Sequence, residues 1–343
     1  MILKKRLILV IVLVIAVGLL FAGGEQQFAR LGNFHLESGE IIENCRIGYR
    51  TFGQLNENKS NIILYPTWFG GTSEHLGNLI GSGKLVDSTR FYVIAVDALG
   101  NGVSSSPSNS KRQGGEQFPF FTIRDMVRTQ HYLLTEVFGV DHIFGVIGGS
   151  MGSFQAFEWL VMYPDFMDKA VAYVCTPQFT SYDLLLLSFE MELIEAAQSA
   201  KMPEKTIQRL GNIGTELFAR TPAYRVEHTP RSEFDEFMKK YAKEASTVYT
   251  SDDKASQLRA MQRHDIFVHF DGSMEQAAEA IRADVLMIVS ETDHLVNPQP
   301  AIDFAKVLDC DLVVLENNCG HLAIGCEMDR CVQLVNQFFN QTK

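Results

Sequence analysis

The sequence has no excess of positive charge. Its 30 Lys and Arg residues are outnumbered by 41 Asp and Glu residues, and the formal net charge is −11. A protein that binds nucleic acid needs clustered basic side chains to neutralise phosphates, and this sequence contains no basic tract of that kind. We therefore exclude nucleic acid as a partner.

Internal repeats, low-complexity segments and sustained heptads are also missing from the sequence, which excludes solenoids, disordered linkers and long coiled coils. Hydrophobic residues make up 46% of the chain and charged residues 21%. This composition is typical of a globular protein with a large core. A length of 343 residues corresponds to one large domain or two ordinary ones.

Long hydrophobic runs are confined to the N-terminus. Residues 4–6 are basic, residues 7–21 form an uninterrupted apolar run, and residues 22–24 are small. This order is that of a secretory signal peptide, so we predict that residues 1–24 direct export to the periplasm or the medium. The alternative is an uncleaved membrane anchor, because the apolar run is close to the shortest that can span a bilayer. In both cases the remaining chain works outside the cytoplasm, and only this segment would contact a membrane.

Cysteine is scarce and unevenly distributed. An even number of cysteines in an exported protein permits disulfides, but buried free thiols are the alternative, and the sequence leaves the pairing open. A zinc site built from Cys319, His321 and Cys326 fits no closed four-ligand spacing, so we predict that no metal is bound. The six cysteines are Cys45, Cys175, Cys310, Cys319, Cys326 and Cys331.

Short, continuous apolar runs alternate with segments of helical periodicity. Runs rich in Val, Ile and Tyr are typical of strands that are buried on both faces. The pattern predicts an α/β fold with a mostly parallel central sheet flanked by helices. We expect an antiparallel edge within residues 34–52, and helices over residues 122–138 and 151–163. The predicted parallel strands are residues 61–65, 91–96, 143–147, 170–174, 285–289 and 312–315.

Residues 176–283 differ from the rest, because they contain helical stretches with no strand-like run between them. We interpret this block as a helical cap inserted into an α/β core formed by residues 25–175 and 284–343. The Met and Phe side chains of the cap could line an apolar pocket, although packing between helices explains any one of them as well. The cap could also join two copies of the chain in a homodimer.

The clearest chemical signal is the pentapeptide Gly148-Gly149-Ser150-Met151-Gly152, a G-x-S-x-G motif. It follows a predicted buried strand and opens a predicted helix, which is the context of a nucleophile elbow. The sharp turn exposes the serine hydroxyl, and the helix N-terminus behind it favours developing negative charge. We predict that Ser150 is a nucleophile, with an ordinary glycine-rich turn as the alternative.

A serine hydroxyl needs a base to accept its proton and an acid to orient that base. After an elbow of this kind the acid comes next along the chain and the histidine last. His294 as the base would need an acid from the cap, so we predict His321. Asp293 and Glu291 are the candidate acids, and we prefer Asp293 because it lies further into the loop after its strand.

An oxyanion hole should accompany the elbow. The backbone N–H of Met151 is the expected first donor, and the second should come from the loop at residues 66–71. The two glycines of this loop allow close backbone approach. We predict Trp68 as the second donor, with Phe69 as the alternative.

These motifs lie in longer segments that resemble the homoserine O-acetyltransferase family of the α/β-hydrolase superfamily. FPFFTIRDMVRTQHYLL and GGSMGSFQAFEWLVMYPD, within residues 118–165, are similar to the family's FP-x-x-T-x-RDMV-x-x-Q block and its nucleophile block. IRADVLMIVSETDHLVNP is similar to the acid-bearing strand and loop, and CGHLA to the histidine segment. The resemblance spans most of residues 45–340. It implies an α/β-hydrolase fold, the Ser150–His321–Asp293 triad and an acyl-serine intermediate.

Two features differ from that family. The family has an aspartate directly after the catalytic histidine, where it helps to hold the amino-acid substrate, but Leu322 occupies this place. A cap carboxylate such as Glu190, Glu192 or Asp265 could replace it. The cytoplasmic members of the family take acetyl groups from acetyl-CoA, which an exported protein would not meet.

We therefore expect a serine enzyme that hydrolyses a small carboxylic ester and needs no cofactor. The first alternative is an O-acyltransferase that moves an acyl group to a hydroxyl acceptor, with acyl-CoA as its co-substrate. The second alternative is a catalytically inactive member of the fold that only binds its ligand.

Overall fold

The computed structural model of this chain describes residues 24–243, 246 and 248–341. The predicted signal segment, residues 1–24, therefore lies outside the described residues except for Gly24. Within the described residues, the helices are all too short or too polar to cross a membrane.

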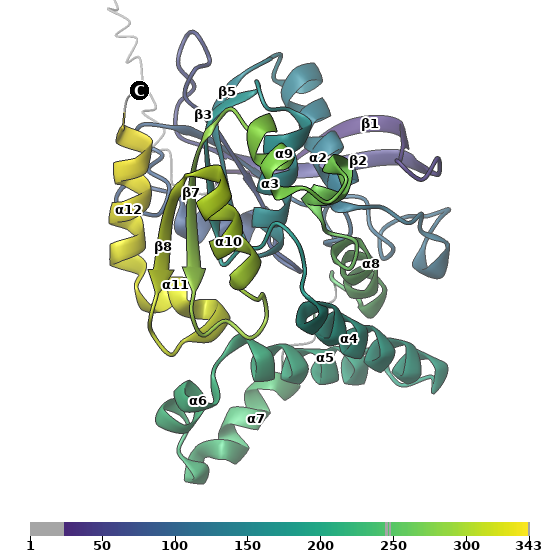
Figure 1. Cartoon of the computed structure of the whole chain (residues 1–343). Coiled ribbons are helices and arrows are strands. Elements are labelled where there is room, and N and C mark those ends of the chain that lie inside the picture. Colours follow the sequence, from purple (N-terminus) through teal and green to yellow (C-terminus); the bar gives the residue numbers. More distant parts are fainter. Residues whose placement is uncertain (1–23, 244–245, 247, 342–343) are drawn as a thin grey trace, which may run out of the picture.

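An eight-stranded sheet forms the centre of the molecule (Figure 1), with the strand order β1-β2-β4-β3-β5-β6-β7-β8. β3 to β8 are mutually parallel where they pair, whereas β1 and β2 run antiparallel to their neighbours. The strands are β1 (Gln27–His35), β2 (Ile41–Phe52), β3 (Ile62–Pro66), β4 (Tyr92–Val96), β5 (Ile143–Gly149), β6 (Met167–Tyr173), β7 (Asp284–Ser290) and β8 (Asp311–Leu315).

This sheet confirms the predicted fold class, and each of the six continuous apolar runs falls in one of the strands β3 to β8. The antiparallel edge was predicted only in part. β2 lies within the expected segment, but the outermost strand is β1, which the sequence pattern did not identify. β1 is interrupted by register shifts on both sides of Gly32, so it shows neither a continuous apolar run nor a regular alternation.

Twelve α-helices are found in the described residues. The predicted start of α2 at Thr122 is correct, because Thr122 and Asp125 form a reciprocal capping box. The helix changes to a π-helical turn over Leu133–Val137 before it ends. The helices are α1 (Ser73–Leu76), α2 (Ile123–Tyr132), α3 (Met151–Met162), α4 (Ser181–Ser199), α5 (Glu204–Ala219), α6 (Pro222–His228), α7 (Phe234–Lys243), α8 (Ser251–Met261), α9 (Met274–Ala280), α10 (Gln299–Leu308), α11 (Ala323–Cys326) and α12 (Met328–Asn340).

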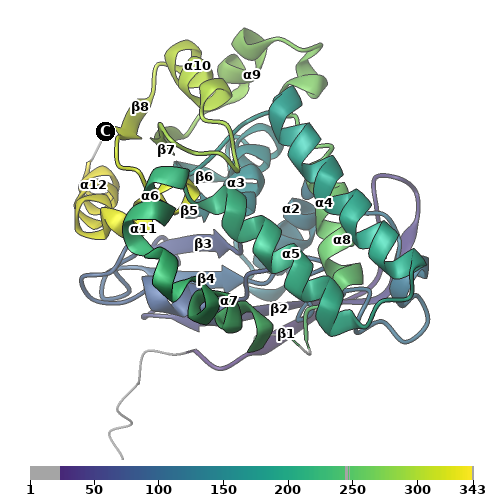
Figure 2. The same cartoon turned by 90° about the horizontal axis from the view of Figure 1, so that it is seen from below.

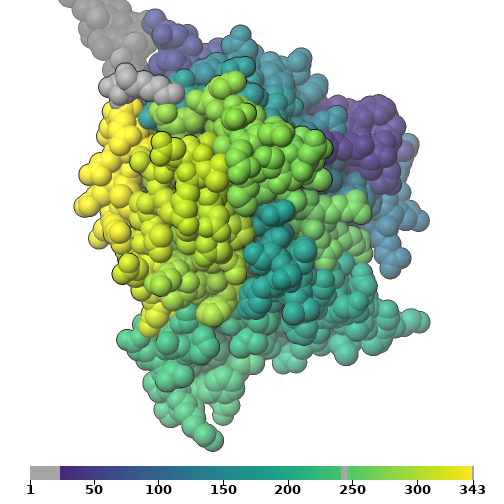
Figure 3. Space-filling view, viewed as in Figure 1, coloured from purple at the N-terminus to yellow at the C-terminus, as the bar shows by residue number. Residues whose placement is uncertain are grey.

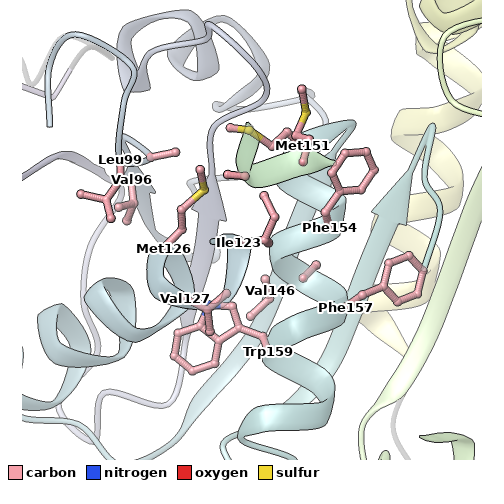
Figure 4. Close-up of a cluster of buried hydrophobic side chains, with 14 of the residues drawn as sticks. Val96, Leu99, Ile123, Met126, Val127, Val146, Met151, Phe154, Phe157 and Trp159 are labelled. Atoms are coloured by element: carbon pink, nitrogen blue, oxygen red, sulfur yellow. The ribbon is translucent and has the colours of Figure 1, made fainter. Parts of the chain in front are cut away.

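Two hydrophobic cores cover the two faces of the sheet. Successive residues of β3 alternate between them, because successive strand side chains point to opposite faces. Ile62 and Leu64 join the core that also contains α2, α3 and α10, and Ile63 and Tyr65 join the core that contains α1, α11 and α12. Figure 4 shows part of the first core, where side chains of α2 and α3 pack together.

The helices of residues 176–283 do not all lie in the same place. α4, α5 and α7 lie at the end of the sheet toward which β7 and β8 point (Figure 1), and from below they cross in front of the strands (Figure 2). They form the protruding lower part of the space-filling view (Figure 3). By contrast, α9 packs against α3 and α10 of the core. The division into core and cap stays a prediction.

Arg124 of α2 links a buried carboxylate of α3, that of Glu158, to Glu37 in the turn between β1 and β2. The guanidinium of Arg124 donates to Glu158 Oε2 at 3.1 Å and to Glu37 Oε1 at 2.8 Å. Glu158 is only 2% exposed, and burial raises its pKa to about 7, although the charge of Arg124 opposes this shift.

This raised pKa predicts a pH dependence of stability. Between about pH 4.5, the ordinary pKa of a glutamate, and about pH 7, the folded protein keeps a proton that the unfolded chain has released. The free energy of unfolding should therefore fall as the pH rises through this window. Glu158→Gln cannot titrate, so denaturant unfolding at both ends of the window should show a smaller fall than in the wild type. Glu192→Gln, an exposed position on α4, is the control, and an equal fall in all three proteins would contradict the assignment.

Candidate active site

Ser150 lies in the turn between β5 and α3 and has an unusual backbone conformation. Its φ is 53° and its ψ is −128°, a region that residues other than glycine rarely adopt. The turn is held because the Ser150 N–H donates to the carbonyl of Tyr173 at 3.0 Å and the Ser150 carbonyl accepts from the N–H of Ser153 at 2.7 Å. This is the geometry of a nucleophile elbow.

The two glycines of the motif are required by close contacts between main chains. A Cβ atom at Gly148 would lie 2.1 Å from the carbonyl oxygen of Gly152, and one at Gly152 would lie 2.7 Å from the carbonyl oxygen of Pro66. Both contacts are shorter than carbon and oxygen tolerate, so β3, β5 and α3 approach one another here only because side chains are absent.

His321 connects Ser150 to Asp293. It lies in the short 3-10 helix Gly320–Leu322 that follows β8. Its Nε2 is 3.0 Å from Ser150 Oγ, and its Nδ1 is 2.7 Å from Asp293 Oδ2. A carboxylate only accepts hydrogen bonds, so we assign the proton to Nδ1, which leaves Nε2 free to accept the hydroxyl proton of Ser150.

Asp293 is held in place by the loop that follows β7. Its second oxygen, Oδ1, accepts hydrogen bonds from the N–H groups of Leu295 at 2.8 Å and Val296 at 2.9 Å. The competing candidates Glu291 and His294 have exposed side chains, whereas Asp293 and His321 are buried. The structure thus brings together Ser150, His321 and Asp293.

Met151, the first expected oxyanion-hole donor, directly follows Ser150, and the loop that carries Trp68 and Phe69 begins where Pro66 approaches Gly152. Met151 is the first residue of α3, so its N–H has no acceptor within the helix. Among the described residues, no hydrogen bond is formed by the N–H of either Trp68 or Phe69. The side chain of Phe69 lines the cavity at Ser150, whereas that of Trp68 stacks on His75 with ring centroids 6.4 Å apart.

Ser150 opens into a cavity of about 40 Å³ that is lined almost entirely by apolar side chains. Three helices contribute to this lining, because Phe154 comes from α3, Leu187 from α4 and Leu258 from α8. The other apolar side chains at the cavity are Phe69, Phe179, Leu186, Met261, Leu295 and Val296.

One charged side chain, Glu190 of α4, also lines this cavity. Its Oε2 lies 2.9 Å from Lys254 Nζ of α8, although the contact lacks the angles of a hydrogen bond. Lys254 Nζ also donates to Thr215 Oγ1 at 3.4 Å. Sequence reasoning did not identify Lys254, because a lysine within a helix carries no signal of the carboxylate that it meets in the folded chain.

The cysteines do not form the zinc site considered from the sequence. Cys319 and Cys326 are joined by a disulfide, and the other four cysteines are thiols. Burial raises the pKa of Cys45 and of Cys310 to about 12 and that of Cys331 to about 11, so these thiols are protonated and unreactive. No group of His, Cys, Asp and Glu side chains within the described ranges is arranged to hold a metal ion.

A family model of the alpha/beta hydrolase fold matches residues 61–325. The chain belongs to the α/β-hydrolase family. This α/β-hydrolase is 29% identical to a probable esterase from Corynebacterium glutamicum, over 88% of this chain and 90% of that protein. It is 27% identical to a homoserine O-acetyltransferase from Methanococcoides burtonii, over 91% of this chain and 72% of that protein.

The solved structure of the acetyl esterase MekB has the same architecture. It matches this α/β-hydrolase with a TM-score of 0.84 at 27% identity, covering 93% of this chain and 97% of that one. The resemblance to homoserine O-acetyltransferases that the sequence predicted is confirmed by the similarity to the Methanococcoides burtonii enzyme. The protein is an enzyme of the α/β-hydrolase superfamily, and its relatives are esterases and acyltransferases.

The position of Asp293 predicts that its carboxylate, and not that of Glu291, orients His321 during turnover. Asp293→Asn would leave the packing of the loop nearly unchanged but favour the wrong tautomer of His321, so we expect turnover of a short ester to fall by roughly 10⁴. Glu291→Gln, two positions away and exposed, is the matched control and should retain wild-type turnover. A large loss in Glu291→Gln with little loss in Asp293→Asn would show that the acid is misassigned.

Proposed function

We propose that this α/β-hydrolase hydrolyses small carboxylic esters through an acyl-enzyme intermediate on Ser150. The observation that carries this proposal is the continuous hydrogen-bonded path from Asp293 through His321 to Ser150 Oγ, which ends at an apolar cavity. A buried imidazole between a carboxylate and a serine hydroxyl is the arrangement that activates serine for attack on a carbonyl carbon.

The mechanism follows from this geometry. Ser150 Oγ attacks the ester carbonyl while His321 Nε2 takes the hydroxyl proton, and the oxyanion is stabilised by the N–H groups of Met151 and Trp68. His321 then protonates the departing alcohol, which leaves an acyl group on Ser150. Water attacks this acyl group with His321 again as the base. His321 then returns the proton to Ser150 Oγ as the bond to the acyl group breaks, and the carboxylic acid is released. Asp293 stabilises the imidazolium in both halves of the cycle.

The size of the cavity supports a short acyl or alcohol group. Its volume of about 40 Å³ is small beside the roughly 300–1,000 Å³ of typical sites for small molecules. A long acyl chain would therefore require the cap helices α4 and α8 to move. The similarity to the acetyl esterase MekB supports a small acyl group, and the similarity to the probable esterase from Corynebacterium glutamicum supports ester hydrolysis.

The cap carboxylates support hydrolysis over transfer to homoserine. Leu322 leaves no carboxylate after His321, and the three candidates that could replace it are either engaged by other groups or exposed. Glu190 is paired with Lys254, and Glu192 is exposed. Asp265 accepts hydrogen bonds from Gln178 Nε2 at 2.7 Å and from the N–H of Phe267 at 2.8 Å.

O-acyl transfer with acyl-CoA as co-substrate is the second candidate, supported by the similarity to a homoserine O-acetyltransferase. The third, an inactive binding protein, is disfavoured because a chain without chemistry has no need to keep the strained Ser150 backbone.

Export and self-association complete the proposal. A disulfide between Cys319 and Cys326 fits an oxidising compartment, as does the N-terminal sequence. If mass spectrometry of the mature protein found residues 1–24 still attached, cleavage of the signal peptide would be contradicted.

A hollow of about 360 Å³ between α5, α6 and α7 is separate from the Ser150 cavity and has the exposed side chains of Leu217, Val226 and Phe234 at its walls. These exposed apolar side chains support a homodimer that forms through the cap. A molar mass equal to that of one chain, measured by light scattering, would contradict the homodimer.

Partitioning of the acyl group separates hydrolysis from transfer. With 4-nitrophenyl acetate and millimolar homoserine, we expect most of the acetyl group to appear as acetate. A substrate ammonium without a carboxylate partner loses a charge-assisted hydrogen bond of about 1.5–3 kcal/mol, which is roughly a ten- to hundredfold loss. Leu322→Asp should raise the share of O-acetylhomoserine, and the uncharged control Leu322→Asn should not. Mostly O-acetylhomoserine from the wild type would make the protein a transferase.

A further inference from the structure

His321 lies inside a small covalent ring. The disulfide between Cys319 and Cys326 closes this ring, which contains the 3-10 helix Gly320–Leu322 and the helix α11. Cys319 is buried and Cys326 is exposed. The other four cysteines are thiols, so this disulfide is the one covalent cross-link among the six cysteines of the chain.

The part of the ring before His321 is tied to the loop that carries Asp293. Thr292 Oγ1 accepts from the N–H of Gly320 at 3.2 Å and donates to the carbonyl of Asn317 at 2.9 Å. Asn317 Oδ1 in turn accepts from the N–H of Cys319 at 3.0 Å. These hydrogen bonds hold the backbone that precedes His321. They also fix its position relative to Asp293, because Thr292 is the neighbour of Asp293 in the chain.

The part of the ring after His321 is held mainly by packing, because Ala323 and Ile324 of α11 are buried in the core that also contains α12, and it has few hydrogen bonds of its own. Just beyond the ring, Asn317 Nδ2 donates to Glu327 Oε1 at 2.6 Å. α11 spans four residues, and a helix of one turn is not stable by its own hydrogen bonds. Asn317 Nδ2 reaches the carbonyl of Ala323 only at 3.3 Å. The disulfide therefore joins the end of α11 to the firmly held backbone at Cys319, and it restrains His321 from both sides.

The segment that joins α5 to α6 contacts the same ring and the residue that precedes it. Thr221 Oγ1 donates to the carbonyl of Asn318 at 2.5 Å. Gly320 has a φ of 64°, and a Cβ atom there would lie 2.9 Å from the carbonyl oxygen of Ala219 at the end of α5. Arg220 Nη1 lies 3.8 Å from Cys326 Sγ. A shift of the ring would thus also disturb the contact between the cap and the histidine segment.

We propose that the Cys319–Cys326 disulfide is a positioning element for His321, so that its reduction lowers turnover without unfolding the enzyme. This inference rests on the proposed function of Ser150 and His321. The disulfide itself touches neither the substrate nor the reacting atoms. It acts by keeping Nε2 within hydrogen-bonding distance of Ser150 Oγ, and a misplacement of about 1 Å can cost about a hundredfold in rate.

Reduction by a dithiol such as dithiothreitol is chemically balanced. A thiolate of the dithiol attacks the exposed Cys326 Sγ and forms a mixed disulfide, while Cys319 Sγ leaves and takes up a proton. The second thiol of the reagent then closes its own ring and releases Cys326 as a thiol. Two electrons and two protons pass from the reagent to the protein, and the number of protein thiols rises from four to six.

The test compares the steady-state kinetics of the oxidised and the reduced full-length enzyme with 4-nitrophenyl acetate. We expect kcat to fall by about tenfold or more on reduction while KM changes by less than about twofold, because substrate binding does not involve the ring. Labelling of Ser150 by a phosphonate probe should slow by the same factor as kcat. Cys326→Ser should show this loss without reductant and no further response to it, and the control Cys310→Ser should respond as the wild type does.

Wild-type kcat in the reduced enzyme and in Cys326→Ser would overturn the proposal. A loss of kcat that merely follows the loss of folded protein, measured by near-ultraviolet circular dichroism at the assay temperature, would also overturn it, because the disulfide would then support the fold and not His321. Failure of the proposed function is a separate result, since the oxidised wild type would then neither hydrolyse the ester nor react with the probe.

Discussion

The hydrogen bond between His321 and Ser150 joins residues that are 171 positions apart in the chain, and it depends on the parallel sheet. β5, β7 and β8 run in the same direction, so the segments after them emerge at one edge of the sheet. The segment after each of these strands carries one of the three residues Ser150, Asp293 and His321. The elbow that presents Ser150 is strained, and the surrounding main chain holds it through hydrogen bonds and glycine contacts that leave no room for an alternative turn.

The parallel strands could be predicted because each is buried on both faces and reads as a continuous apolar run. The same physical pattern located Ser150, since the motif stands where one of these runs meets a helix. Order along the chain then indicated Asp293 and His321, which the structure places within hydrogen-bonding distance of each other. β1 could not be found in this way, because the register shifts at Gly32 break its periodicity.

Contacts between distant segments explain what the sequence did not reveal. The pair Glu190–Lys254 forms because α4 and α8 meet over the cavity, and nothing in either helix indicates its neighbour. The pairing of Cys319 with Cys326 was one of several that the sequence allowed, and the turn at His321 decides it by bringing these two sulfurs together. Both features lie around the site, where segments that are far apart in the sequence meet beside Ser150 and His321.

Intact-mass spectrometry after incubation with a fluorophosphonate probe tests most directly whether Ser150 is the acylated nucleophile. We predict one adduct in the wild type and in Ser188→Ala, a control at an exposed position on α4. Ser150→Ala should form no adduct and lose turnover by several orders of magnitude, because the triad acts as a unit. An adduct of unchanged yield in Ser150→Ala, or wild-type turnover in that variant, would show that Ser150 is not the nucleophile.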